Sequence, residues 1–311
     1  MAAETGPVTQ SEDDLSTLQR WVQRSIRDPQ LAYRAMFYTA MIFFLVFTLF
    51  PFYWLLVLAL TPNRLIFNMG ILPEGFNISV FWDVFQQVPI HLYILNSFVI
   101  AITTTIIVLL VASLAGYVFG RLRFRGKGPL MLLILVISFF PPAAFILPLF
   151  RIFTGNVVVM GRTTPDLFNT AGAMIIPFSA LMLPLSIFIL TTFYAQIPDG
   201  LEDAARVEGT TRIGALIRVI VPLSMPGIST AGILTFIAVY QEFFFSFLMT
   251  DGRVENWAPL VWGILNFQGR YSDLYNYMAA ASIIGVVPVA LLVVIAQEKI
   301  VSGLTQGALK E

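Results

Sequence analysis

The chain has 311 residues, of which 58% are hydrophobic and 12% are charged, and its 18 basic residues are balanced by 18 acidic ones. Because a soluble domain typically carries about 25% charged residues, this composition and a mean hydropathy of +0.82 exclude an ordinary soluble protein and indicate a membrane protein. The zero net charge leaves no basic surface for nucleic acid, and the lack of cysteine together with a single histidine, His91, predicts no metal site and no thiol chemistry.

Residues 1–35 form a predicted cytoplasmic extension before the membrane domain. Its apolar residues recur at helical spacing and three arginines fall on another face, which is typical of an amphipathic helix. The apolar positions are Leu15, Leu18, Val22 and Ile26, and the arginines are Arg20, Arg24 and Arg27. The pattern fits equally a helix on the cytoplasmic lipid surface and a helix packed on a partner subunit. Asp28 before Pro29 predicts the start of the next helix.

Six apolar stretches are each long enough to cross a bilayer core, which needs about 20 helical residues. They lie at about Met36–Leu60, Ile94–Gly120, Leu130–Phe153, Phe168–Tyr194, Pro226–Met249 and Met278–Ile300. A membrane β-barrel would instead show segments of about ten residues with alternating polarity. We therefore expect an all-α integral membrane bundle of six transmembrane helices over residues 36–300, without a signal peptide before it.

The basic residues predict which side of the membrane each connector faces. Most of them lie in the N-terminal segment, in the connectors after the second and fourth spans, and in the tail. They are Arg20, Arg24, Arg27, Arg34, Arg121, Arg123, Arg125, Lys127, Arg206, Arg212, Arg218, Lys299 and Lys310. By the positive-inside rule these segments face the cytoplasm. We expect a multi-pass protein of the cell membrane with both termini, including a tail at 301–311, in the cytoplasm.

Small residues on the second span predict a close helix contact. Ala112, Gly116 and Gly120 recur every four positions, so one face of the helix allows another backbone to approach. The partner helix belongs either to this chain, which we favour, or to another subunit.

Glu242, next to Gln241, is the one ionisable residue placed well inside a predicted span. Acids inside the membrane are costly and often mark a solute pathway. The alternative is a hydrogen-bonded carboxylate near the outer interface that holds helices together. A single such acid argues against a carrier driven by protons or sodium ions, and no constellation for an intramembrane enzyme is present.

The connector at 196–222 differs from the others. Residues Asp199 to Val207 read as a short helix that starts with an Asp199 cap after Pro198, and Gly209 marks its end. A second helix, with Ile213, Leu216, Ile217 and Ile220 on one stripe, is predicted to end before Pro222. Such a compact projection suits docking to a soluble partner, and the alternative is an ordered loop without a partner.

The connector at 250–277 is rich in aromatic residues and also carries acids. The aromatic residues are Trp257, Trp262, Phe267, Tyr271, Tyr275 and Tyr277. Aromatic faces beside hydrogen-bonding groups suit sugar rings and contact with a docked partner. An aromatic belt at the membrane surface would produce the same composition.

The 196–222 connector resembles the cytoplasmic Glu-Ala-Ala loop of permeases in binding-protein-dependent ABC importers. Here Asp203-Ala204-Ala205 is followed by three residues and Gly209, then by nine residues and Val219-Ile220-Val221-Pro222. The spacing agrees throughout, whereas Asp replaces Glu and Val replaces Ile and Leu. Four further segments resemble the maltose-type second permease subunit of the sugar-uptake branch. These are Leu95–Phe98, Ser113–Arg121, Tyr240–Phe243 and Ser302–Lys310, so the resemblance covers about residues 35–311.

This resemblance implies a type I ABC importer permease fold and a subunit that is not an enzyme. It implies import of a sugar or oligosaccharide into the cytoplasm, with a sugar-related solute such as glycerol phosphate as the alternative and a secondary carrier as a weaker one. The implied partners are a second permease subunit, two ATPase subunits, an extracytoplasmic sugar-binding protein and the lipid bilayer. The chain itself would bind no cofactor, because the ATPase subunits use the ATP.

The resemblance also implies roles for named residues. In the loop, Glu202 or Asp203 would pair with a basic group of an ATPase subunit, Ala204 and Ala205 would enter a tight surface, and Gly209 would make the turn before Pro222. In the tail, the implied ATPase contacts are Leu304, Thr305, Gln306 and Gly307. In the 250–277 connector, the implied contacts with the binding protein are Trp262, Asn266, Phe267 and Tyr271.

Overall fold

The structure is a computed structural model, and it describes residues 29–269 and 274–308 of the chain. The predicted amphipathic helix at 15–27 and the predicted contact residue Tyr271 lie outside these ranges. So do the side chains of the predicted tail contacts Leu304, Thr305, Gln306 and Gly307, although their backbone is helical.

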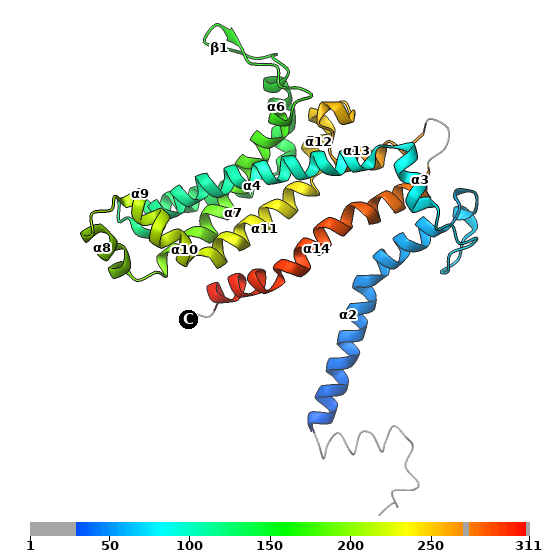
Figure 1. Cartoon of the computed structure of the whole chain (residues 1–311), viewed down its shortest axis with the longest axis horizontal. Coiled ribbons are helices and arrows are strands. Elements are labelled where there is room, and N and C mark those ends of the chain that lie inside the picture. Colours follow the sequence, from blue (N-terminus) through cyan, green and yellow to red (C-terminus); the bar gives the residue numbers. More distant parts are fainter. Residues whose placement is uncertain (1–28, 270–273, 309–311) are drawn as a thin grey trace, which may run out of the picture. The chain divides into compact units, whose positions relative to one another are not determined.

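The regular secondary structure of the described chain is helical apart from one short hairpin (Figure 1). Its first half contains α2 (Pro29–Leu60), η2 (Asn63–Asn68), α3 (Val80–Gln87), α4 (Ile90–Arg121), α5 (Lys127–Ser138), η3 (Pro142–Phe145), α6 (Ile146–Phe153), β1 (Val158–Val159) and β2 (Arg162–Thr163). Its second half contains α7 (Ala171–Ala195), α8 (Asp199–Val207), α9 (Arg212–Ala215), the π-helical turn η4 (Leu216–Ile220), α10 (Val221–Leu223), α11 (Met225–Tyr240), α12 (Phe244–Met249), η5 (Val254–Asn256), α13 (Leu260–Leu265) and α14 (Tyr275–Ala308).

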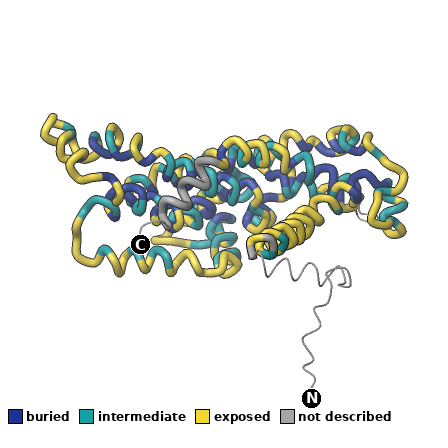
Figure 2. Tube along the Cα trace, turned by 90° about the horizontal axis from the view of Figure 1, so that it is seen from below, coloured by how far each residue is buried: buried dark blue, intermediate teal, exposed yellow. Residues whose placement is uncertain are grey.

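The chain divides into two compact units, residues 1–57 and residues 58–311. The described part of the first unit is the apolar helix α2, which begins at Pro29 as the Asp28-Pro29 pair predicts. The second unit holds all the other elements. Its buried residues lie mainly on the helix faces turned toward neighbouring helices (Figure 2).

Four single helices are long and apolar enough to cross a membrane, at Ala32–Leu60, Ile90–Arg121, Ala171–Ala195 and Tyr275–Gln297. They match the first, second, fourth and sixth predicted spans. Two further spans are present only if each of two bent helix pairs counts as one, which gives up to six in the described chain.

The third predicted span, Leu130–Phe153, is a bent pair of helices and not one continuous helix. It is broken after Ser138, and the helices on either side, Lys127–Ser138 and Pro142–Phe153, are bent by 85°. The break contains Pro141 and Pro142, which lack an N–H group and force the preceding residue away from helical geometry.

The fifth predicted span, Pro226–Met249, is wrong in its limits. Helix α11 ends at Tyr240, and residues 241–243 separate it from α12. On the other side, the predicted helix end before Pro222 is wrong, because α10 continues to Leu223 and meets α11 at an angle of 81°. Pro222 lies at the start of α10, where its missing N–H group is tolerated.

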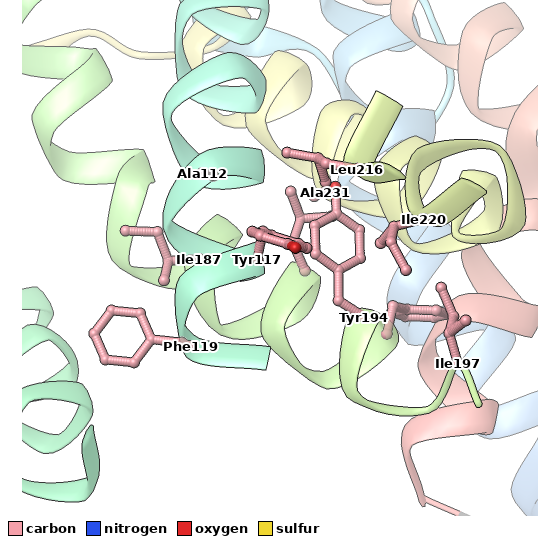
Figure 3. Packing of buried hydrophobic residues seen from close by; sticks show 11 residues of the cluster. Ala112, Tyr117, Phe119, Ile187, Tyr194, Ile197, Leu216, Ile220 and Ala231 are labelled. Carbon is pink, nitrogen blue, oxygen red and sulfur yellow. The ribbon is translucent and has the colours of Figure 1, made fainter. Parts of the chain in front are cut away.

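Helices α4 and α7 pack closely in the second unit. A Cβ atom on Gly116 would lie 3.0 Å from Leu190 Cβ, and one on Gly120 would lie 3.0 Å from Tyr194 Cβ. The stripe of small residues therefore serves packing within this chain. Around this contact lies a buried cluster in which the Tyr194 ring reaches from α7 toward Leu216 and Ala231 (Figure 3).

The two connectors of functional interest lie at opposite ends of α4. Helices α8 and α9 lie near its C-terminal end, and α3 and α13 lie near its N-terminal end (Figure 1). The hairpin of β1 and β2, which the sequence pattern did not predict, pairs Val158 with Thr163 and Val159 with Arg162.

Candidate functional site: two connectors held by one helix

Helix α8 begins at Asp199, as the sequence predicts, but Asp199 is not its cap. The N-cap residue is Pro198, and no side chain caps the helix. Asp199 instead occupies the first helical position, where its Oδ1 atom lies 3.0 Å from Nη2 of Arg121. An acid in the first turn still faces the positive end of the helix dipole.

Arg121, the last residue of α4, joins α8 to the membrane helices. Its side chain is 4% exposed, and its Nε atom donates to Oε2 of Glu202 over 2.8 Å. Its Nη1 atom donates to the carbonyl of Ile197 over 2.6 Å. Tyr117, one turn earlier on α4, donates its hydroxyl to Oε1 of Glu202 over 2.5 Å. Both oxygen atoms of the Glu202 carboxylate are therefore bonded to α4.

The electrostatics of this cluster favour an ionised Glu202. Burial by itself raises the pKa of Glu202, but the hydrogen bonds from Tyr117 and Arg121 and the charge of Arg121 outweigh burial and hold that pKa below its usual value. A buried ion pair is stable only when its members are also hydrogen-bonded, as they are here.

This geometry changes the role predicted for Glu202. The side chain is buried and is turned toward α4, so it positions α8 and is not presented to a partner. Asp203 is exposed and lies 3.7 Å from Arg206 of the next turn. Among the two acids considered, Asp203 is the one available for the predicted pairing. Ala204 is exposed beside it, and Ala205 is half-buried.

The turn after α8 has the geometry that the sequence predicts. Gly209 has a φ of +90°, in the left-handed region that favours glycine. Its N–H group donates to the carbonyl of Arg206 over 3.0 Å, and the N–H group of Thr210 donates to that of Ala205 over 3.1 Å. Thr211 then caps α9 by accepting from the N–H group of Gly214 over 3.1 Å. Two short helices thus meet at a fixed turn.

The apolar stripe predicted on the second helix is divided between two faces. Leu216 and Ile220 are buried in the cluster with Tyr194, whereas Ile213 and Ile217 are exposed. Val207 at the end of α8 is also exposed, with 89% of its surface accessible. The 196–222 connector therefore presents small and apolar side chains next to Asp203.

The described part of the 250–277 connector is held by the N-terminal end of α4. Asn96 donates from Nδ2 to the carbonyls of Val254, over 2.8 Å, and Ala258, over 3.0 Å. Ser97 accepts from the N–H group of Leu260 over 2.8 Å. Tyr93 donates to the carbonyl of Gly252 over 2.9 Å. These bonds satisfy backbone groups of a segment with little regular structure.

Three of the residues predicted to contact a binding protein are packed within this chain. Trp262 donates from Nε1 to the carbonyl of Ser246 over 3.0 Å, and its ring stacks on Phe247. Phe267 is 3% exposed and stacks on Tyr277. Asn266 donates to the hydroxyl of Tyr93 over 2.7 Å, although it is partly open to solvent. Trp262 and Phe267 thus shape the connector from inside.

Glu242 lies in the break between α11 and α12, where it binds the first N–H groups of α12. Its carboxylate accepts from the N–H groups of Phe244, over 2.7 Å, and Phe245, over 3.1 Å. The carboxylate is hydrogen-bonded, as the second interpretation of Glu242 expects, but these bonds lie within residues 242–246 and do not link two separate helices. Gln241 beside it is exposed.

Sequence reasoning missed the anchoring role of α4. In the sequence Tyr117 belongs to the family resemblance and Arg121 to the basic residues of a connector, and neither pattern predicts that they bind α8. Their spacing of four positions, which puts both on one helix face, was the available signal. Within the described residues, no group of three His, Cys, Asp or Glu residues could hold a metal ion.

Comparisons with known proteins agree with these features. Residues 110–306 match the family described as "Binding-protein-dependent transport system inner membrane component". The chain is 36% identical to the sulfoquinovosyl glycerol transport system permease protein SmoH of Agrobacterium fabrum, over 86% of this chain and 90% of that protein. It is 31% identical to the trehalose/maltose transport system permease protein MalG of Thermococcus litoralis, over 85% and 92% respectively.

A solved structure shows the same fold. The chain matches a subunit in the crystal structure of a bacterial ABC transporter involved in the import of the acidic polysaccharide alginate, with a TM-score of 0.66 and 17% identity. The match covers 87% of this chain and 97% of that subunit. The fold is therefore that of a type I ABC importer permease, and these relatives are transport permeases and not enzymes.

Proposed function

The chain belongs to the family of inner membrane components of binding-protein-dependent transport systems, and from this membership we propose that it is one permease subunit of an ATP-driven sugar importer. Relatives named for sulfoquinovosyl glycerol, for trehalose and maltose, and for trehalose support a sugar, an oligosaccharide or a glycoside as the solute. In this proposal a second permease subunit completes the pathway, and an extracytoplasmic binding protein delivers the solute.

The 196–222 connector would transmit force from the ATPase subunits. This part of the proposal is supported by the buried hydrogen bonds from Tyr117 and Arg121 to Glu202. They attach α8 firmly to the membrane helix α4. A projection that is fixed to a membrane helix can move that helix when a partner moves the projection. The exposed side chains of Asp203, Ala204 and Val207 offer a surface for such a partner.

The same proposal fixes the orientation of the chain. The 196–222 connector and both termini face the cytoplasm, in agreement with the excess of basic residues on that side. The 250–277 connector and the hairpin of β1 and β2 then face the outside. The ATP would be bound and hydrolysed by two ATPase subunits that dock on the cytoplasmic face, so this chain would hold no nucleotide.

The direct test is reconstitution of the whole importer. The chain is co-expressed with its partner permease and ATPase subunits, purified through a tag on this chain, and placed in liposomes together with the loaded binding protein. We expect the ATPase to co-purify and labelled sugar to be transported only with ATP. The matched control carries an ATPase subunit that binds but does not hydrolyse ATP. Transport without the ATPase, or failure of the ATPase to co-purify, would contradict the proposal.

A further inference from the structure

Helix α4 holds a connector at each of its ends through side-chain hydrogen bonds. At its N-terminal end, Tyr93, Asn96 and Ser97 bind the backbone of residues 252–260. At its C-terminal end, Tyr117 and Arg121 bind Glu202 of α8. We name these two sets of bonds the N-terminal hold and the C-terminal hold.

Asn96 of the N-terminal hold and Arg121 of the C-terminal hold project from nearly the same side of α4. Asn96 and Arg121 are 25 positions apart, which is about seven turns of an α-helix, so the two side chains point in nearly the same direction. The same spacing separates them by about 37 Å along the helix axis. The distance along α4 between these two side chains is therefore larger than the thickness of a membrane core, which is about 30 Å.

The sequence of α4 also makes it stiffer than the other long helices of the described chain. α2 contains Pro51, α7 contains Pro177 and Pro184, and α14 contains Pro288, whereas the 32 residues of α4 include no proline. Proline is the commonest cause of a helix kink. The tight packing of Gly116 and Gly120 against α7 supports α4 further along its length.

We propose that α4 acts as a rigid link between the two connectors. When the binding protein docks on the 250–277 connector, α4 transmits the resulting displacement to α8, and Asn96 and Arg121 are the positioning residues at its two ends. This inference rests on the proposed function, because it presumes a partner at each end. A rigid element that is bonded at both ends moves both connectors together, whereas a loose end would leave the other connector unaffected. Both holds are therefore required for the displacement to pass.

The test uses the complete reconstituted importer and measures the ratio of ATP hydrolysis with loaded binding protein to hydrolysis without it. For Asn96→Ala and for Arg121→Gln we expect this ratio to fall at least fivefold. The double variant should lose no more than the stronger single variant, because a rigid link that is already released at one end transmits nothing. Hydrogen exchange of residues 199–207 should respond to the binding protein in the wild type and not in Asn96→Ala.

The matched control is Ser113→Ala, which removes a 2.8 Å hydrogen bond between Ser113 and the Tyr194 hydroxyl, at a position between the two holds on the same helix. We expect the control to keep the wild-type ratio. A wild-type ratio and a wild-type exchange response in Asn96→Ala would overturn the proposal. So would an equal fall in Ser113→Ala, since it would show a general loss of helix packing. Failure of the wild-type ATPase to assemble would instead count against the proposed function.

Discussion

The Glu202 carboxylate shows how one residue can be assigned the wrong partner from sequence alone. Its position in a polar connector predicts pairing with another protein. In the structure it is instead paired with Arg121, which lies 81 positions earlier in the chain. The sequence places Arg121 in a different connector and gives no sign that the two meet. Removing one member of such a buried pair leaves the other charge unpaired, which typically costs about 3–5 kcal/mol.

The lowered pKa of Glu202 predicts a release of α8 at low pH. A carboxylate whose pKa is lower in the folded state stabilises that state fully above the unfolded-state pKa of about 4.3. This contribution disappears as the pH falls through the lower folded-state pKa. A spin label at the exposed position Val207 should become more mobile over that acidic range in the wild type. Glu202→Gln should show no such transition, and Asp203→Asn should keep the wild-type profile. A wild-type transition in Glu202→Gln would refute this origin.

Gly209 allows a second prediction at the scale of one residue. A Cβ atom at this position would meet nothing within 4 Å. The backbone φ of +90° is therefore the reason that glycine is required here, and not lack of space. Gly209→Val should therefore weaken the turn by roughly 1–2 kcal/mol, and transport and ATPase co-purification should both fall. Gly209→Asn is the matched control, because asparagine tolerates left-handed backbone better. Equal behaviour of the two variants would show that strain at this turn is unimportant.

At the scale of elements, apolar length predicted where the helices are but not where they break. The stretches at 130–153 and 226–249 satisfy the length criterion, although the structure divides both. The Pro141-Pro142 pair does indicate an interruption of the first stretch, because proline disfavours helical geometry at the residue before it. The break at 241–243 had a fainter signal, because Glu242 was assumed to lie within a helix although it caps the next one.

The contact between α4 and α7 gives a prediction at this scale. Gly116→Val should separate the two helices, because even its Cβ atom would lie 3.3 Å or less from the Leu190 and Thr191 backbone. We expect a loss of about 1–3 kcal/mol, seen as a lower midpoint of thermal unfolding in detergent. Gly128→Val is the matched control, since the space around Gly128 is open. If both variants unfold at the same temperature, the close approach of the helices does not limit stability.

At the scale of the molecule, the membrane class, the helical fold and the position of the 196–222 connector could be predicted from the sequence. They depend on composition, apolar length and local turn residues, which act over short stretches of chain. The holds at the two ends of α4 could not be predicted from the sequence, because each joins residues that are far apart in the chain. Arg121 and Glu202 are about 80 positions apart, and Asn96 is about 160 positions from Val254 and Ala258.

The holds also sharpen the predicted contact between the 250–277 connector and the binding protein. Trp262 and Phe267 are packed within the chain and the backbone of residues 252–260 is bonded to α4, so we expect a contact from the segment at 268–273, which includes Tyr271. The N–H group of Leu274 donates to the carbonyl of Phe267 over 3.1 Å, so the two residues that flank this segment lie close together. An Asn-Gly pair can therefore replace the six residues as a two-residue turn.

This replacement distinguishes the contact from an aromatic belt at the membrane surface. If residues 268–273 engage the binding protein, the replacement should lower both sugar transport and the stimulation of ATP hydrolysis by loaded binding protein, by tenfold or more. Purification of the complete importer in normal yield is the control for folding, because the residues that hold the connector are all retained. If the segment only anchors the chain at the lipid surface, stimulation will survive the replacement. That result would end the assignment of Tyr271 to the binding-protein interface.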